Sequence, residues 1–273
     1  MCYLEAYREI WLVDTEYYEP DGERPVPVCV AARELRTNRA VVQWYTEFGE
    51  KPPYSVESDC LFVSYSAAAE LGCHIARGWK LPEHVLDLYV AFKMLVNGLN
   101  ILPPKIPGKK QGGLSLLFAL QFFGIAPLNV TAINAKEASR DLVKRGGPWT
   151  LEEKAEILAY CLSDADQLRP LLKAMLERIN FQVTLFHCQY TRPQAWMQWN
   201  GIPIDTETFH LLDKRWESIQ LELVKVMDAP FGLYEGTTFK ISRFERWLVE
   251  HEKPWPTLPS GQLSATQHSL TGN

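Results

Sequence analysis

Residues 9–18, EIWLVDTEYY, place two acidic side chains directly after an apolar run. The Ile, Trp, Leu and Val of that run predict a buried β-strand. Side chains alternate between the faces of a strand, so Asp14 and Glu16 point to one side and Thr15 to the other. Taken alone, the acidic pair is typical of a solvated strand end, and further carboxylates are needed to make it a metal site.

Length and composition set the limits on what this chain is. It has 273 residues, 47% of them hydrophobic, and a formal net charge of −5. It is long enough for one large domain or two modest ones. The acidic balance argues against a protein that coats nucleic acid, although local basic patches and bound cations still permit binding. With no apolar stretch near the roughly 20 residues that span a bilayer and no signal peptide, we expect a cytoplasmic protein with no membrane partner.

The cysteines show no pattern of metal ligands or disulfides. They are scattered without a C-x-x-C pair, and several lie in apolar segments, which predicts reduced thiols in the core. The six are Cys2, Cys29, Cys60, Cys73, Cys161 and Cys188.

The chain changes from strands to helices along its length. Segments rich in Val, Trp and Tyr predict strands over residues 9–16, 25–35, 40–48 and 59–65. Helices are predicted over 66–78, 114–124 and 150–179, whereas 84–98 fits either a strand or a helix. Thr150 and Glu153 form a capping box for the helix at 150–179, and we expect Pro170 to divide it into two.

The composition changes again near residue 180, so we predict a first domain over 1–180 and a mainly helical segment over 181–273. Within this segment a turn at residues 200–203 leads to a helix capped by Asp205. The tail beyond residue 250 is rich in Pro, Ser, Thr and Gly and is expected to be loosely ordered.

A third carboxylate comes from the predicted helix at 150–179. Tyr160 and Asp164 are four residues apart and share a face, whereas Asp166 lies about 200° from Asp164 around the helix axis. Asp164 packed against Asp14 and Glu16 gives oxygen ligands of the kind that Mg²⁺ and Mn²⁺ prefer. Phosphodiester hydrolysis uses such carboxylate clusters, with two ions roughly 4 Å apart.

These motifs carry a family resemblance. Asp14-Thr15-Glu16 and the Tyr160-x-x-x-Asp164 pair resemble the first and third motifs of the DEDD 3′-5′ exonucleases, specifically the proofreading domain of family-A DNA polymerases. Segments up to residue 178 are similar to that domain, and WNGIPIDTETF, FKISRFERWL and PWPTLPSGQL resemble the segment that leads into the polymerase. The polymerase palm and fingers are absent from this sequence. The fold implied is α/β, a ribonuclease-H-like mixed sheet flanked by helices, followed by a mainly helical segment.

The middle motif departs from the family pattern. The family has an asparagine and, four residues later, an aspartate, and Ser66 and Glu70 stand at these positions. The resemblance implies that Asp14 bridges two Mg²⁺ or Mn²⁺ ions, that Glu16 and Asp164 bind one of them, and that Glu70 supports the other through water. The resemblance also implies that Tyr160 orients the attacking water. Asp87 competes with Glu70 for its role but matches a structural aspartate of the family.

The substrate implied is single-stranded DNA or a frayed DNA 3′ end, and a separate polymerase or replication protein is a further expected partner. Candidates to hold the phosphate backbone are basic residues in two loops, with soluble loops as the plain alternative: Lys105, Lys109, Lys110, Lys144 and Arg145. Tyr17, Tyr18, Phe118 and Trp149 are aromatic candidates for base stacking. His74, His84 and His187 have no metal-ligand spacing.

Two alternatives to a DNA exonuclease stay open at this point. A 3′-5′ exoribonuclease shares the same carboxylates. A catalytically silent DNA-binding or scaffold fragment is favoured by the unusual Ser66 and Glu70.

Overall fold

The computed structural model describes residues 2–99, 101, 113–126, 132–258, 260 and 262–264. Clustering of the backbone divides the chain into two compact units, residues 1–201 and 202–273. Within the described residues, no helix has the length and apolar character needed to cross a membrane.

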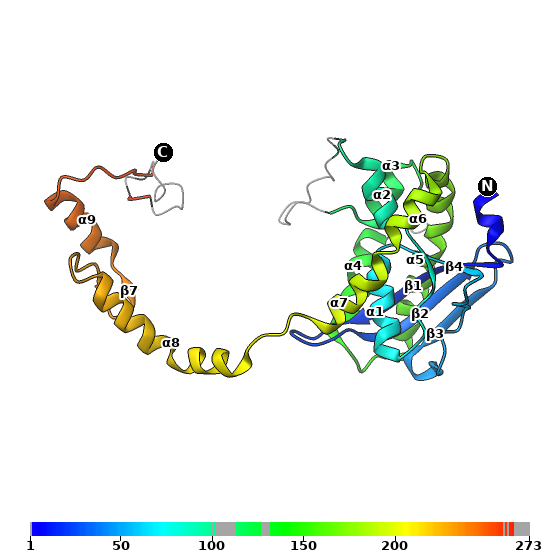
Figure 1. Cartoon of the computed structure of the whole chain (residues 1–273), viewed down its shortest axis with the longest axis horizontal. Helices are drawn as coiled ribbons and strands as arrows, with labels where there is room; N and C mark the ends of the chain where they lie inside the picture. The colour runs from blue at the N-terminus through cyan, green and yellow to red at the C-terminus, as the bar shows by residue number, and fades with distance from the viewer. Residues whose placement is uncertain are drawn as a thin grey trace. The chain divides into compact units, whose positions relative to one another are not determined.

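A five-stranded sheet forms the centre of the first unit, with helices on both of its faces (Figure 1). The strand order is β3-β2-β1-β4-β5, and only β2 runs against the others. This mixed sheet flanked by helices is ribonuclease-H-like, as the family resemblance implies. The strands are β1 Glu9–Tyr18, β2 Val26–Glu34, β3 Ala40–Trp44, β4 Cys60–Ser64 and β5 His84–Asp87.

The helices of this unit cover both faces of the sheet, and all but α1 follow the last strand in sequence. Two short 3₁₀ helices also occur: η1 Cys2–Ala6 precedes β1, and η2 Tyr45–Glu47 follows β3. The α-helices are α1 Ala67–Arg77, α2 Leu88–Val96, α3 Leu116–Phe122, α4 Ala132–Arg145, α5 Leu151–Leu176, α6 Phe181–Cys188 and α7 Thr191–Asn200.

Strand β1 buries alternate side chains on opposite faces, as expected from its pattern. Ile10 and Leu12 pack in the core cluster that includes residues of α2, α5 and α6. Trp11 and Val13 pack in a second cluster, with residues of α1 and with Ala195 of α7. Side chains at 14 and 16 therefore continue the face of α5, and position 15 continues the face of α1.

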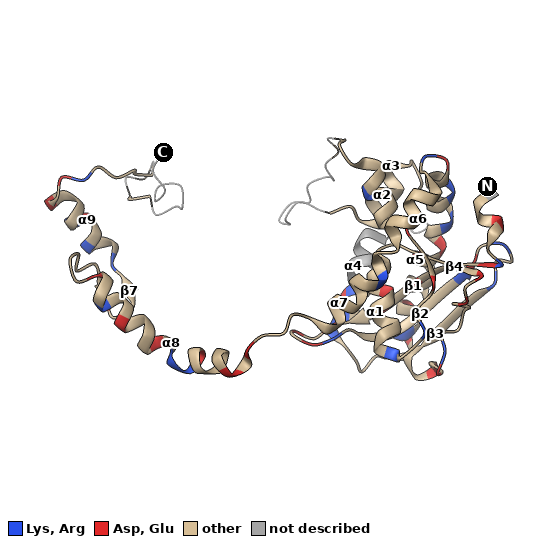
Figure 2. Cartoon of the chain, viewed as in Figure 1, with Lys and Arg blue, Asp and Glu red and all other residues tan. Residues whose placement is uncertain are grey.

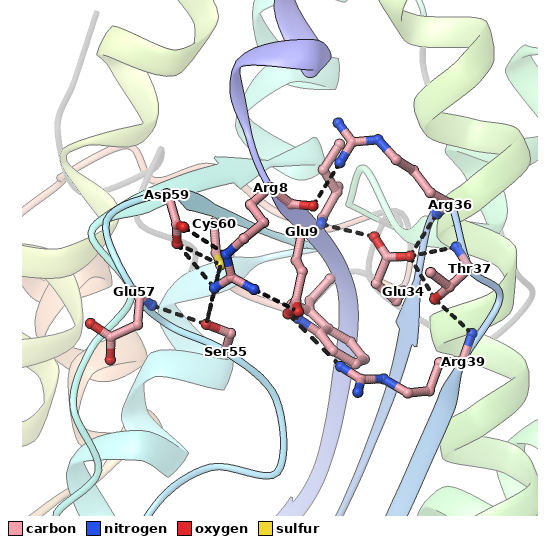
Figure 3. A network of polar contacts seen from close by, with 12 residues as sticks. Arg8, Glu9, Glu34, Arg36, Thr37, Arg39, Ser55, Glu57, Asp59 and Cys60 are labelled. Atoms are coloured by element: carbon pink, nitrogen blue, oxygen red, sulfur yellow. Dashed lines mark hydrogen bonds and ion pairs between the residues drawn. The ribbon is translucent and has the colours of Figure 1, made fainter.

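A polar network surrounds the start of β1, where it lies between the end of β2 and the start of β4 (Figure 3). Arg8 donates to Asp59 at 2.6 Å, which ties the chain before β1 to the chain before β4. The buried Glu34 carboxylate accepts from the backbone N–H groups of Ile10 and Thr37, at 3.1 and 2.6 Å. These contacts hold β1 in register with both neighbours.

Helix α5 runs through Pro170 without a break, so the predicted division into two helices is wrong. Proline removes one backbone hydrogen bond and costs a helix about 3 kcal/mol. Leu168, Leu171 and Leu172 are buried on either side of Pro170, and their burial offsets that cost. The capping box of Thr150 and Glu153 is present as predicted.

Residues 181–201, which form α6 and α7, belong to the first unit. Phe181 and Cys188 of α6 belong to the main core, and Ala195 of α7 is buried against α1 residues. These apolar contacts join residues 181–201 to the sheet.

The second unit contains α8 Thr206–Met227, the short strands β6 Tyr234–Glu235 and β7 Thr238–Phe239, and α9 Ile241–Glu250. Asp205 caps α8 through the Thr208 N–H, as predicted. Acidic and basic residues alternate along α8 (Figure 2). In the tail, Trp255 donates its indole N–H to the Ser264 carbonyl at 2.8 Å.

Candidate metal-dependent active site

The site forms where β1 extends beyond the end of β4, its parallel neighbour. Pairing with β4 ends at Leu12 and Val63, whereas β1 continues to Tyr18. Past Leu12 that side of β1 is open, and Glu70 of α1 fills the gap. Its carboxylate accepts hydrogen bonds from the backbone N–H and the hydroxyl of Thr15. Glu70 thus reaches β1 from the face of α1, opposite to the face of α5.

Asp14 is the acidic residue on which the others converge. Burial raises the pKa of its carboxyl well above the usual range, and the charges of Glu16, Glu70 and Asp164 raise it further. One of its oxygens, Oδ2, is buried without a hydrogen-bond partner. The three elements that carry these residues therefore bring four carboxylates within electrostatic reach of one another.

Glu70 is only 4% exposed, so it is not a surface residue of α1. Burial raises the pKa of this carboxyl well above its usual range, Glu16 and Asp87 add to the rise, and the Thr15 hydrogen bonds oppose it. Its Oε2 is a second buried oxygen without a hydrogen-bond partner. A buried, acceptor-only oxygen of this kind is costly unless a proton or a cation compensates it.

Asp87 has a structural role at the starts of α1 and α2. Its carboxylate accepts from the N–H groups of Ser66 and Ala67, at 3.0 and 2.8 Å, where α1 begins. It also accepts from Tyr89 N–H at 2.8 Å and so caps α2. Ser66 has a φ of 74° and its side chain makes no cap hydrogen bond. Asp87 therefore holds the left-handed turn that starts α1 and orients Glu70.

Helix α5 supplies the third side of the site. The Tyr160 hydroxyl donates to Asp164, and burial together with the nearby charges of Asp164 and Glu16 raises the pKa of Tyr160. The phenol therefore stays protonated. Asp164 is 7% exposed and accepts from Gln167 Nε2 at 3.1 Å. Asp166 points elsewhere and pairs with Arg33, as the helical spacing predicts.

The basic candidates fare differently. Lys105, Lys109 and Lys110 lie outside the described residues. Arg145 is bound by Glu153 through two contacts of 2.8 and 2.9 Å, so this guanidinium ties the end of α4 to the start of α5. Lys144 is exposed in the last turn of α4.

Most of the aromatic candidates are structural. Trp149 packs edge-to-face on Trp44 and Tyr18, with ring centroids 5.3 and 6.3 Å apart. Phe118 packs on the buried Phe92. Of these four residues, Tyr17 lies near the carboxylates. Burial raises the pKa of its hydroxyl to about 12, and the charge of Glu70 contributes to this rise.

Two features of the site were not predicted from the sequence. Thr15 is the hydrogen-bond donor to Glu70, and the pairing register of β1 with β2 shifts between Glu16 and Tyr17. Tyr17 pairs with Pro27 of β2, and proline has no N–H to give to the ladder. A proline inside a predicted central strand is the signal that could have revealed this bulge.

The residues suit a divalent cation in their chemistry. In the part of the chain that the structure describes, no three His, Cys, Asp or Glu side chains are arranged as ligands around a single point. Four carboxylates nevertheless lie near one another, and Asp14 and Glu70 each hold a buried oxygen without a partner. Hard oxygen donors of this kind fit Mg²⁺ or Mn²⁺.

Known proteins match this chain in structure and not in sequence. No family and no curated protein matches its sequence. Among solved structures it is similar to Escherichia coli RNase D, an exoribonuclease involved in structured RNA processing, with a TM-score of 0.46 and 11% identity. The match covers 96% of this chain and 66% of RNase D, so the chain spans about two thirds of that protein.

Proposed function

We propose that this chain is a metal-dependent 3′-5′ exonuclease of the DEDD type, which releases nucleoside 5′-monophosphates from a nucleic-acid 3′ end. One observation carries the proposal. Asp14, from the central strand, lies within reach of Glu16, Glu70 and Asp164, and two buried oxygens of this cluster have no hydrogen-bond partner. A buried carboxylate oxygen without a hydrogen-bond partner costs free energy, which a functional cation at Asp14 and Glu70 would offset.

The chain's own residues would divide the work. Asp14, Glu16 and Asp164 would hold one divalent ion, and Asp14 with Glu70 would support a second. When bound, the two ions would lower the pKa of the attacking water and stabilise the leaving oxygen. Tyr160 would orient that water by accepting a hydrogen bond at its hydroxyl oxygen, since its own proton is donated to Asp164 and the raised pKa keeps the phenol protonated.

Thr15 and Asp87 would position Glu70, Thr15 by hydrogen bonds to its carboxylate and Asp87 by holding the start of α1. The additional methylene of Glu70 relative to the family's aspartate lets its carboxylate reach the Thr15 N–H while its Oε2 stays unpartnered. This arrangement supports an active site despite the unusual residue. A scaffold with no catalytic role would have no need to keep such a costly group buried.

DNA is the proposed substrate, because the segments 199–209, 239–248 and 254–263 resemble the region that joins an exonuclease to a polymerase. An exoribonuclease is the alternative within the same chemistry. Association with a polymerase or replication protein is a further proposal and rests on the same resemblance.

The test is degradation of 5′-labelled single-stranded DNA and RNA in Mg²⁺, in Mn²⁺ and in EDTA. We expect a ladder of DNA products shortened from the 3′ end, lost in EDTA, and absent for Asp14→Asn. Faster loss of RNA would assign the chain to the ribonucleases. Intact strands with both metals would leave a binding or scaffold protein.

A further inference from the structure

A cavity of about 430 Å³ lies in the first unit beside the carboxylate cluster. Three elements form it: the end of β1 with the loop that follows, one side of α1, and one side of α7. Its volume falls within the range of roughly 300–1,000 Å³ typical of small-molecule sites. None of the carboxylates of the proposed active site lines it.

Small residues leave the space open on the side of α1. Ala68, Ala69 and Gly72 line the cavity there, at positions where larger side chains would fill it. A Cβ on Gly72 would meet only Pro25 Cγ, at 3.8 Å, which is ordinary contact. The helix therefore has room at this position, and the glycine leaves that room empty.

The opposite wall, on α7, combines an aromatic ring with two amides. Trp199 is partly buried against the core, and the guanidinium of Arg24 lies 4.5 Å from its ring centroid. Gln194 and Gln198 are one helical turn apart and line the same cavity. Glu19 adds a carboxylate.

Tyr17 connects the cavity to the carboxylates. It lines the cavity, and Glu70 is close enough to contribute to its raised pKa. Ser66 and Ala69, which also line the cavity, flank the turn of α1 that carries Glu70. A strand whose phosphate lies at Asp14 and Glu70 would therefore have a neighbouring nucleotide at this opening.

We infer that this cavity binds a nucleobase adjacent to the phosphate that is cut, with Trp199 and Tyr17 as stacking surfaces and Gln194 and Gln198 as hydrogen-bond partners. Aromatic rings stack on any base, and glutamine amides both donate to and accept from base edges. Glu19 accepts from exocyclic amino groups and repels phosphate, so the lining favours a base over the backbone. The inference rests on the proposed exonuclease function and extends it to residues of α7.

Photo-crosslinking tests the position of the base without requiring catalysis. Single-stranded DNA carrying 5-iododeoxyuridine at one of its three 3′-terminal positions is irradiated with the full chain in EDTA, and adducts are mapped by mass spectrometry. We expect one of the three probes to label Tyr17 or Trp199. Adducts confined to other residues would overturn the inference.

Binding measurements on matched variants test the energetic role. Trp199→Ala and Gly72→Leu are expected to weaken binding of fluorescent single-stranded DNA in EDTA by about tenfold or more. Trp196→Ala removes an exposed tryptophan of the same helix that does not line the cavity, and it should leave affinity unchanged. Circular dichroism melting of each variant separates lost binding from lost folding.

An abasic strand completes the test. If the cavity holds a base, a strand abasic at the crosslinked position should bind the wild type as weakly as the intact strand binds Trp199→Ala. An equal loss for Trp199→Ala on abasic and intact strands would overturn the inference. Crosslinking at the cavity without hydrolysis in any metal would reject the exonuclease and keep the base site, whereas hydrolysis without such crosslinks would do the reverse.

Discussion

Arg33 of β2 and Asp166 of α5 form a bidentate ion pair, with Nε–Oδ1 at 2.7 Å and Nη2–Oδ2 at 2.8 Å. Both side chains are mostly buried, at 16% and 29% exposure. Only two residues earlier on the same helix, Asp164 faces Tyr160 and the Asp14 cluster. Helix α5 thus uses one aspartate to dock on the sheet and another to complete the proposed site.

Exchanging each aspartate for asparagine should separate these roles. Asp164→Asn removes a charge from a repelling cluster, so we expect a loss of nuclease activity on the order of 100-fold with unchanged or higher stability. Asp166→Asn breaks the pair with Arg33 and should cost about 1–2 kcal/mol of unfolding free energy while activity stays within a few-fold. Urea denaturation and DNA degradation at saturating Mg²⁺ measure both effects. The opposite assignment of the two losses would contradict the proposed site.

Neutralising Asp14 should stabilise the metal-free protein. Burial and the charges of neighbouring carboxylates raise the folded pKa values of Asp14 and Glu70, whereas the unfolded values are near 3.8 and 4.5. A raised folded pKa contributes stability at low pH that is lost as pH rises above the unfolded value. In EDTA at pH 8, Asp14→Asn should therefore raise the unfolding free energy by about 1–3 kcal/mol.

The pH profile and the metal response provide the controls for that experiment. The advantage of Asp14→Asn should shrink as pH falls toward 4, and millimolar Mg²⁺ should raise the melting temperature of the wild type more than that of the variant. Asp141→Asn, at an exposed position of α4, should show neither effect. A variant less stable than the wild type at pH 8 in EDTA would show that the cluster does not repel.

Asp87→Asn should damage both stability and the site, because Asp87 joins the starts of α1 and α2. The new amide NH₂ would oppose an N–H donor of this turn, such as that of Ala67, now bonded at 2.8 Å. Leaving buried donors unsatisfied costs about 2–3 kcal/mol. We expect that loss in denaturation, together with a higher Mn²⁺ concentration for half-maximal activity as Glu70 loses its position. Asp205→Asn, at the exposed cap of α8, should leave activity unchanged, and equal effects of the two would refute the special role of Asp87.

The sequence predicted those parts of the site that follow from the regular periods of strands and helices. Alternation along β1 placed Asp14 and Glu16 together, and helical spacing separated Asp164 from Asp166. Contacts that depend on tertiary packing could not be predicted. The bond from Thr15 to Glu70 exists because β4 ends at Ser64, and α5 continues through Pro170 because leucines on both sides are buried. Secondary-structure propensities alone predict neither the end of β4 nor the continuity of α5.

The buried His74 should make the protein sensitive to mild acid. Its Nε2 lies 2.6 Å from the Tyr54 hydroxyl and its Nδ1 lies 3.0 Å from the Lys80 carbonyl, which fits a neutral ring that donates through Nδ1. Burial lowers the pKa of His74 from 6.5 to about 4. A lowered folded pKa gives stability that is present above pH 6.5 and is lost as pH falls toward 4. Between pH 7.5 and 5 this residue should cost the wild type about 2 kcal/mol of unfolding free energy.

Comparison with His74→Gln isolates this residue from the carboxylates, whose effect has the opposite sign over the same range. Glutamine does not titrate, so the difference in unfolding free energy between wild type and variant should narrow by about 2 kcal/mol on going from pH 7.5 to 5. His210→Gln, at an exposed position of α8, should show a constant difference. Guanidinium denaturation at four pH values measures both. A difference independent of pH for His74→Gln would mean that the folded ring is charged as readily as the unfolded one.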